Sequence, residues 1–195
     1  MEIKRSGSQT SGRKKVAGEK TFLKKFSQII KENFDEFLLK KGFELEASSI
    51  EEYFAKRVYK RNKQFIRIYA NVNPREMAEY WSIILGEGDR EWPELDWNSV
   101  GLWHFMVELG QKEAEEYSLK NKTTGAFLKQ VKAAKNDLKI YGESFLNNNL
   151  DLFYRLRSQI NKKREPYKIY SPDKTGKYKM AYEPKSAKLK KKFGG

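Results

Sequence analysis

The most regular pattern in the chain lies between residues 22 and 43, where apolar side chains recur every three or four positions. These positions are Phe22, Leu23, Phe26, Ile29, Ile30, Phe34, Phe37 and Leu38. Such spacing places apolar groups on one face of an α-helix. Thr21 suits the N-cap and Gly42 the C-terminal cap. The pattern therefore predicts one helix over residues 22–43 whose apolar face packs on a sheet.

A different pattern follows, in which apolar and polar side chains alternate. It covers residues 52–60 and 64–72, on either side of a turn-like segment at 61–63. Alternation with a short polar interruption is typical of a β-hairpin. A third strand is expected from Tyr80 to Leu85, ending where Gly86 and Gly88 provide a turn.

Helical spacing returns after Thr124. The apolar positions of this second helix are Phe127, Val131, Ala134, Leu138 and Tyr141. Gly142 and the three asparagines at 147–149 then interrupt the pattern before a third helix, expected from Leu150 to Asn161. A helix, antiparallel strands and further helices predict an α+β fold: an N-terminal helix, a small antiparallel sheet of three or more strands, and two or three C-terminal helices.

Composition divides the 195 residues into three segments. Residues 1–20 are polar and basic and are expected to be a disordered tail, residues 21–161 a single α+β domain, and residues 162–195 a basic extension. The chain contains no cysteine, which excludes disulfides and thiolate catalysis, and no cofactor is expected. Without an apolar run of about eighteen residues or a signal-peptide pattern, we expect a cytoplasmic protein with no membrane partner.

The net charge of +14 is concentrated at the two ends. Residues 161–195 contain twelve Lys or Arg and three acidic residues, and residues 1–21 contain six basic and two acidic residues. Residues 22–160 are nearly neutral. Basic segments bind polyanions by releasing counterions, whatever the sequence of the polyanion. The distribution favours RNA or DNA as the partner.

The C-terminal segment also interleaves tyrosines with its basic residues, a pattern suited to phosphates and stacked bases. The candidate nucleic-acid-binding residues are Lys162, Lys163, Arg164, Tyr167, Lys168, Tyr170, Tyr178, Lys188, Lys190, Lys191 and Lys192. The same alternation around residues 171–176 describes a β-hairpin whose tyrosines pack on the domain. The lysines at 188–192 repel one another, which disfavours a folded role for that run.

A second candidate surface is the Trp-rich acidic segment 81–108, which contains all four tryptophans of the chain. Trp92, Glu94, Asp96 and Trp97 could bind a basic protein, with aromatic anchors and a charged rim. The alternative is that Trp81 and Trp103 are core residues and that the acids solvate a connecting loop. A divalent metal on Asp89, Glu91, Glu94 and Asp96 is also conceivable, although their spacing matches no calcium-loop motif.

Catalytic motifs are weak. His104 is the only histidine, so a metal site with two His ligands cannot form, and we interpret His104, between Trp103 and Phe105, as a structural residue. Gly86 and Gly88 form a Gly-x-Gly pair, but the other residues of a dinucleotide-binding or P-loop motif do not follow it. The expected class is a non-enzymatic protein.

The order of elements, with a Lys-rich first helix ending in Lys41–Gly42–Phe43, resembles small bacterial α+β domains, some of which are similar to immunity proteins of polymorphic toxin systems. The likeness covers roughly residues 22–160 and implies a protein-interaction role. A hydrolase or nuclease that uses Asp89, Glu91, Glu94 or Asp96 with a metal is a third interpretation, supported only by the clustering of these acids. Two interpretations have more support. One is a non-enzymatic protein that contacts nucleic acid or a ribonucleoprotein through basic tails. The other is an immunity-like module that binds a protein through the acidic loop 86–98.

Overall fold

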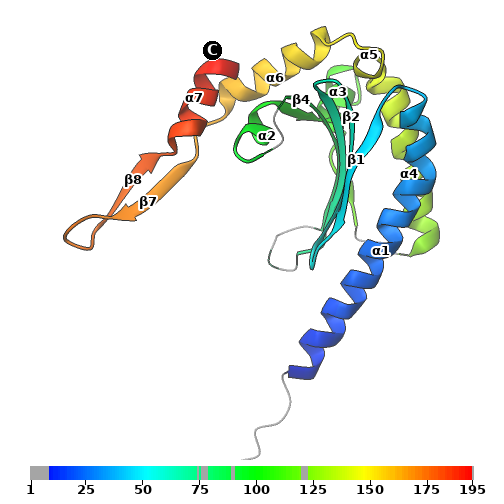
Figure 1. Cartoon of the computed structure of the whole chain (residues 1–195), viewed down its shortest axis with the longest axis horizontal. Coiled ribbons are helices and arrows are strands. Elements are labelled where there is room, and N and C mark those ends of the chain that lie inside the picture. The colour runs from blue at the N-terminus through cyan, green and yellow to red at the C-terminus, as the bar shows by residue number, and fades with distance from the viewer. Residues whose placement is uncertain (1–8, 74, 76–78, 89–90, 120–122, 195) are drawn as a thin grey trace, which may run out of the picture. The chain divides into compact units, whose positions relative to one another are not determined.

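A computed structural model describes residues 9–73, 75, 79–88, 91–119 and 123–194, with the backbone alone for residues 9–17. The fold is α+β, as predicted: along the chain, an N-terminal helix is followed by the strands of an antiparallel sheet and then by several C-terminal helices (Figure 1). The helices are α1 (Gln9–Leu39), α2 (Glu94–Trp97), α3 (Leu102–Glu108), α4 (Thr124–Tyr141), α5 (Glu143–Leu146), α6 (Asp151–Lys163) and α7 (Pro184–Phe193). None of these described helices is long and apolar enough to cross a membrane.

Among the described residues, six strands form one sheet. They are β1 (Glu44–Ile50), β2 (Phe54–Arg61), β3 (Gln64–Asn71), β4 (Tyr80–Glu87), β5 (Ser99–Gly101) and β6 (Tyr117–Ser118). The order is β1-β2-β3-β4-β5, and β6 also pairs with β4. The predicted hairpin is confirmed as β2 and β3, and the predicted third strand as β4. Strands β7 (Lys168–Pro172) and β8 (Tyr178–Tyr182) form a separate two-stranded sheet.

The chain divides into two compact units. Unit 1 comprises Met1–Lys60, Arg67–Ile83 and Glu116–Asn136, and unit 2 comprises Arg61–Ile66, Ile84–Glu115 and Asp137–Gly195. Residues 162–194, expected as an extension of the domain, therefore cluster with α6 in unit 2.

Helix α1 differs from its prediction at the N-terminal end and agrees with it at the C-terminal cap. It begins at Gln9, so it includes part of the segment expected to be a disordered tail, and Thr21 lies inside the helix and is not its N-cap. Extending an existing helix adds a hydrogen bond per residue without a new nucleus, and Lys, Arg and Ala accept helical geometry readily. At the other end, Gly42 has a φ of 79°, its N–H binds the carbonyl of Leu39, and the N–H of Phe43 binds that of Leu38. This is a Schellman motif, which confirms Gly42 as the cap.

The core of unit 1 lies between α1, α4 and the sheet. Phe26 and Phe34 of α1 are completely buried, as are Val131 of α4 and Trp81 of β4. The Phe26 ring lies 6.0 Å from the Trp81 ring, in an edge-to-face contact. The predicted stripes are therefore the core, except that Phe37 and Tyr141 are only half-buried.

Polar contacts also attach α1 to the sheet. Arg57 of β2 donates from Nη2 to both carboxylate oxygens of Asp35, each at 2.8 Å, and the Tyr59 hydroxyl donates to Asp35 Oδ1 at 2.7 Å. Arg57 is buried, so its guanidinium requires this carboxylate. Burial also raises the pKa of Tyr59, which keeps its hydroxyl protonated as a donor.

The core of unit 2 is built on α6. Phe153 and Leu156 are buried, and the Phe153 ring lies 5.4 Å from that of Phe145. Gly86 packs directly under the ring of Phe65, because a Cβ on this glycine would lie 2.1 Å from Phe65 Cζ. This close approach explains the first glycine of the Gly-x-Gly pair, and Gly88, with a φ of 90°, forms the turn that was predicted.

Candidate functional site

The acidic Trp-rich loop is partly a core element of unit 2. Trp97 of α2 is completely buried, and its backbone carbonyl accepts a 2.7 Å hydrogen bond from Asn161 Nδ2 of α6. Its expected role as a binding anchor is therefore wrong, because a partner cannot reach this ring. Trp92 differs, since 62% of its surface is exposed.

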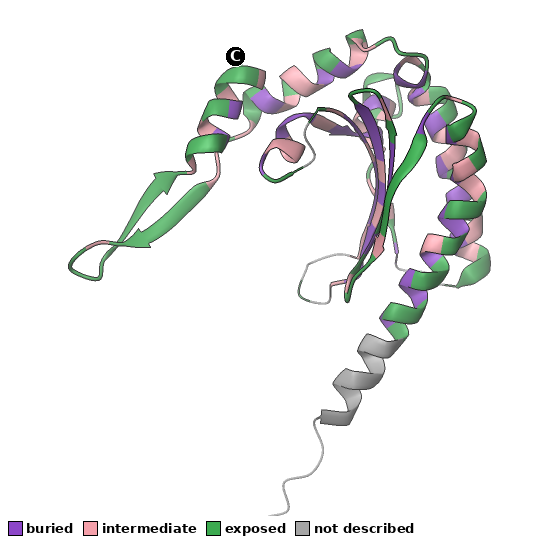
Figure 2. Ribbon diagram, viewed as in Figure 1, coloured by how far each residue is buried: buried purple, intermediate pink, exposed green. Residues whose placement is uncertain are grey.

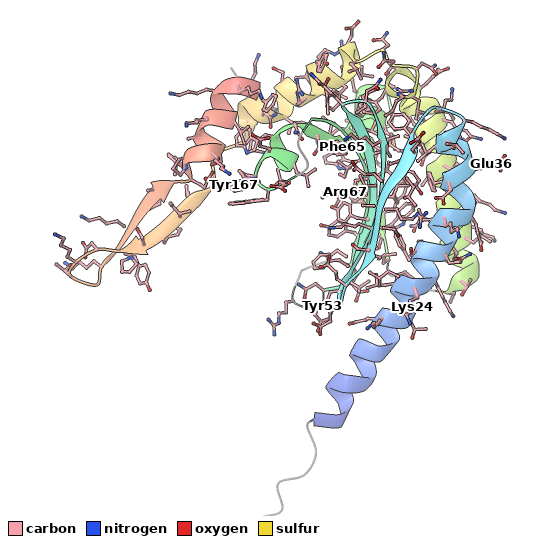
Figure 3. All side chains as sticks on the ribbon, viewed as in Figure 1. Lys24, Glu36, Tyr53, Phe65, Arg67 and Tyr167 are labelled. Atoms are coloured by element: carbon pink, nitrogen blue, oxygen red, sulfur yellow. The ribbon has the colours of Figure 1, made fainter. Side chains whose placement is uncertain are left out.

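Asp96 joins this loop to the C-terminal segment. Its carboxylate accepts a hydrogen bond from the Tyr167 hydroxyl, and its backbone carbonyl accepts one from Arg164. The Arg164 guanidinium also lies over the Trp97 ring, 5.4 Å from the centroid. Tyr167 lies between the base of the β7–β8 hairpin and α2 (Figure 3). The acidic loop and the basic C-terminal segment, which the sequence analysis treated as alternative binding surfaces, therefore pack against each other within unit 2.

Burial, reinforced by Asp96, raises the pKa of Tyr167 to about 12. The phenol therefore stays protonated at neutral pH and donates to the carboxylate. The Tyr167 ring also packs 5.4 Å from that of Trp92. Both Arg164 and Tyr167, expected to contact nucleic acid, instead hold the C-terminal segment on α2.

Lys190 has a structural role as well. Its ammonium donates to the backbone carbonyls of Asn161, Lys162 and Arg164, at 3.1, 2.8 and 2.6 Å. These carbonyls lie at the C-terminal end of α6, where an α-helix lacks internal partners for its last acceptors. A cation there is also favoured by the helix dipole. Lys190 therefore caps α6 and is unsuited to the phosphate contact expected of it.

Helix α7 contains the lysine run for which the sequence disfavoured a folded role. The Glu183 carboxylate accepts from the N–H groups of Lys185 and Ser186, at 3.0 and 2.5 Å, and caps the helix. Leu189 is buried. The remaining lysines of the helix are exposed: Lys185, Lys188, Lys191 and Lys192. Because one face of α7 packs and the other bears the charges, the lysines do not prevent folding.

The β7–β8 hairpin is the most exposed part of the described chain, and Figure 2 colours both strands as exposed. The hairpin prediction is confirmed, but its tyrosines do not pack on the domain. The exposed fractions are 64% for Tyr170, 73% for Tyr178 and 44% for Tyr182. A two-stranded hairpin gains little stability by itself, so exposing large rings on both strands requires another explanation.

The register of this hairpin gathers the rings on one side. Lys168 pairs with Tyr182, Tyr170 with Met180, and Pro172 with Tyr178. Paired residues share a side of the sheet, and side chains alternate along each strand. These six residues, called the tyrosine face below, therefore point the same way. Met180, also 49% exposed, and Tyr182 were not among the predicted residues, although two-residue alternation from Tyr178 would have included both.

The tip of the hairpin is ordered around Asp173. Its Oδ1 accepts from the N–H of Thr175 at 2.8 Å and from that of Lys177 at 3.1 Å. These contacts lower the pKa of Asp173, the hydrogen bonds from Thr175 having the largest effect. Residues 168–182 contain four lysines and this one acidic residue. The lysines are Lys168, Lys174, Lys177 and Lys179, so the hairpin is basic along its length.

The described residues offer little support for the metal alternative. They contain no group of three His, Asp or Glu side chains positioned to hold a metal ion, whereas Asp89 lies outside the described residues. His104 stacks on Trp103 with the ring centroids 3.4 Å apart. Burial, with a smaller contribution from the Arg164 charge, lowers the pKa of His104 to about 4, so it is neutral at physiological pH.

Comparison with known proteins gives no further assignment: no family model matches the chain, and no curated protein or solved structure matches it at a significant level.

Proposed function

We propose that this protein is a non-enzymatic nucleic-acid-binding protein that contacts phosphates through the lysines of the β7–β8 hairpin and the exposed face of α7. The observation that carries the proposal is the hairpin itself, whose ten strand residues are all exposed and whose lysines greatly outnumber its acids. Exposed apolar groups mark interaction sites, and a surface of positive charge attracts polyanions.

The contacting residues differ from the predicted set. Exposure supports retaining Lys162, Lys163, Lys168, Tyr170, Tyr178, Lys188, Lys191 and Lys192. It also supports adding Lys174, Lys177 and Lys179 at or near the hairpin tip. We remove three predicted residues, Arg164, Tyr167 and Lys190, from the contacting residues, because their polar groups bind other parts of unit 2. They position the basic surface and do not contact the ligand.

A binding assay with charge variants tests the proposal. The fluorescence anisotropy of a labelled oligonucleotide is measured over a range of salt concentrations for the wild-type protein and for a variant with Lys168, Lys174 and Lys177 changed to glutamine. Each lost phosphate contact should reduce the slope of log affinity against log salt by about 0.7 for a single strand. Changing Lys188, Lys191 and Lys192 to glutamine should have a similar effect. Deleting α7 is a poorer test, because Lys190 and Leu189 belong to the fold of unit 2.

The matched control changes three exposed lysines of α1, Lys24, Lys25 and Lys31, to glutamine, which removes the same charge from unit 1. This control should reduce the slope much less than the hairpin variant does. Equal reductions would show that binding follows net charge alone and would contradict a defined site.

Trp92 supports a second candidate, an immunity-like module that binds a basic protein through the acidic loop. Its ring is exposed, and Glu91 beside it is exposed as well. Under this alternative, Trp92→Ala should abolish binding to a basic protein partner while the affinity for nucleic acid stays unchanged. If the protein binds nucleic acid as proposed, changing the hairpin lysines should weaken that binding, and Trp92→Ala should not.

A further inference from the structure

We infer that the tyrosine face of the β7–β8 hairpin stacks on unpaired bases, which makes single-stranded nucleic acid the ligand of this protein. The inference rests on the proposed function and adds the kind of nucleic acid and the contacts that select it. The lysines alone would bind any polyanion, because phosphate contacts carry no information about the bases.

The first support is that three of the six exposed residues on this face are tyrosines. Tyr170, Tyr178 and Tyr182 share it with Met180, Pro172 and Lys168, and all six side chains are exposed. Among the hydroxyls of these three tyrosines, as the structure describes them, only that of Tyr182 has a hydrogen-bond partner, Glu165 Oε2 at 3.4 Å. Aromatic side chains stack on bases that have left a helix, whereas the faces of paired bases are covered by their neighbours.

The second support is the spacing of the rings. Tyr170 pairs directly with Met180, so Tyr178 and Tyr182 are its two diagonal neighbours across the hairpin. Diagonal neighbours lie about 7–8 Å apart. Stacked bases of one strand are separated by about 3.4 Å, so a base between two parallel rings requires about 7 Å. The spacing of these positions therefore matches one base stacked between Tyr170 and each of its diagonal neighbours.

The third support concerns duplex binding, the main alternative for a basic β-ribbon. A ribbon that reads the major groove needs side chains that bind base edges, chiefly Arg or Lys on guanine and Asn or Gln on adenine. Residues 168–182 contain no Arg, Asn or Gln, and Lys168 is the one lysine on the tyrosine face. Stacking rings with lysines around them suit a single strand of any sequence, because every base has a face to stack on.

The fourth support is charge complementarity. Lys168 lies on the tyrosine face, and Lys174 and Lys177 lie at the exposed tip. Asp173, the one acid of the hairpin, accepts the hydrogen bonds that form the turn and pairs with Lys179 at 3.7 Å. A strand that crosses the tyrosine face would thus meet cations at both ends of the row of rings.

The experiment compares three probes of equal length and label: a single-stranded oligonucleotide, the same backbone with abasic sites in place of its bases, and a duplex. Each is titrated by anisotropy against the full-length protein at one salt concentration and then over a salt series. The single strand should bind most tightly. Removing the bases should weaken binding roughly 5- to 150-fold for each stacked base, the fold-change that about 1–3 kcal/mol produces, without altering the salt slope.

Paired variants locate the effect. Changing Tyr170 and Tyr178 together to leucine should weaken binding to the single strand but leave the salt slope and the affinity for the abasic probe unchanged. Changing the same two residues to phenylalanine keeps the rings and should restore binding. Tyr154→Leu on α6, which removes a tyrosine that is 39% exposed, is the control away from the face. Amide hydrogen exchange of residues 168–182 verifies that each variant keeps the hairpin.

The outcomes separate the two levels of the proposal. Salt-sensitive binding with equal affinity for all three probes, unaffected by the leucine variant, would overturn base stacking and retain the proposed function. Tighter binding to the duplex would likewise overturn it. No salt-sensitive binding to any probe would overturn the proposed function and the inference together.

Discussion

Lys190 and Lys191 are adjacent lysines of α7 for which the structure predicts opposite behaviour. The Lys190 ammonium binds three carbonyls at the end of α6, whereas Lys191 is exposed. We therefore expect Lys190→Met to lower the stability of unit 2 and to leave ligand contacts intact. Lys191→Met should do the reverse, with unchanged stability and a smaller salt slope.

The expected loss of stability follows from the contacts of the ammonium. A hydrogen bond that involves a charged group contributes about 1.5–3 kcal/mol, and a cation at a helix C-terminus contributes about 0.3–1 kcal/mol. Lys190 is half-exposed, so its carbonyl partners regain water when the ammonium is removed. The value of a single charged hydrogen bond, about 2 kcal/mol, is therefore the appropriate estimate. For a chain of this size it corresponds to a melting temperature about 4–8 °C lower.

The assay combines thermal melting with amide hydrogen exchange. Exchange at residues 161–164 and in α7 should accelerate in Lys190→Met, because the lost contacts join these two segments, while exchange in α1 should stay unchanged. Lys191→Met is the control of equal side-chain and charge change. If Lys190→Met melts within about a degree of the wild type and exchanges normally, the capping role is wrong.

Three further predictions concern the core and pH. Trp97→Ala should lower the free energy of unfolding by about 3–5 kcal/mol, because its ring is completely buried. Trp92→Ala should lower it by no more than about 1.5 kcal/mol, the contribution of an aromatic pair. Denaturant titration measures both values, and similar losses would contradict the difference in burial. Phe34→Ala should also cost about 3–5 kcal/mol, and a melting temperature close to that of the wild type would show that this face of α1 is not core. The pKa of His104 is about 4 in the folded chain and about 6.5 unfolded, so the unfolded state binds the extra proton and stability should fall as the pH drops from about 6.5 towards 4. His104→Gln should flatten the decline in melting temperature between pH 7 and 5, and an identical decline would refute this role.

Local periodicity was sufficient to predict α1, α4 and α6 and the strands β2, β3 and β4, but β1, β5, β6 and α3 were not predicted. The face of α1 that contains Phe26 and Phe34 is buried because a helix must cover its apolar stripe, whatever the partner. The end of α1 was equally predictable, since Gly42 and Phe43 contain the whole cap within a few residues. The hairpin at β7–β8 was one of two alternatives, and its register follows from simple alternation.

The roles of single residues in the candidate site depend on contacts between distant segments and could not be predicted in the same way. Asp96 meets Tyr167 across 71 positions, and Lys190 meets the end of α6 across 26 to 29 positions. Neither relation leaves a periodic signal. The helix α7 was missed because lysine repulsion was considered without the buried Leu189 and the Glu183 cap, which offset it. Trp97 was assigned to a surface since composition alone does not distinguish it from Trp92.

Photochemical cross-linking is the most direct test of whether nucleic acid lies on the hairpin. A single-stranded oligonucleotide that carries a photoreactive base is bound to the full-length protein at low salt and irradiated, and the cross-linked residues are identified by mass spectrometry. Cross-links should concentrate at Tyr170 and Tyr178 and should disappear at high salt. Cross-links confined to unit 1, or none at the hairpin despite salt-sensitive binding, would contradict the proposed site.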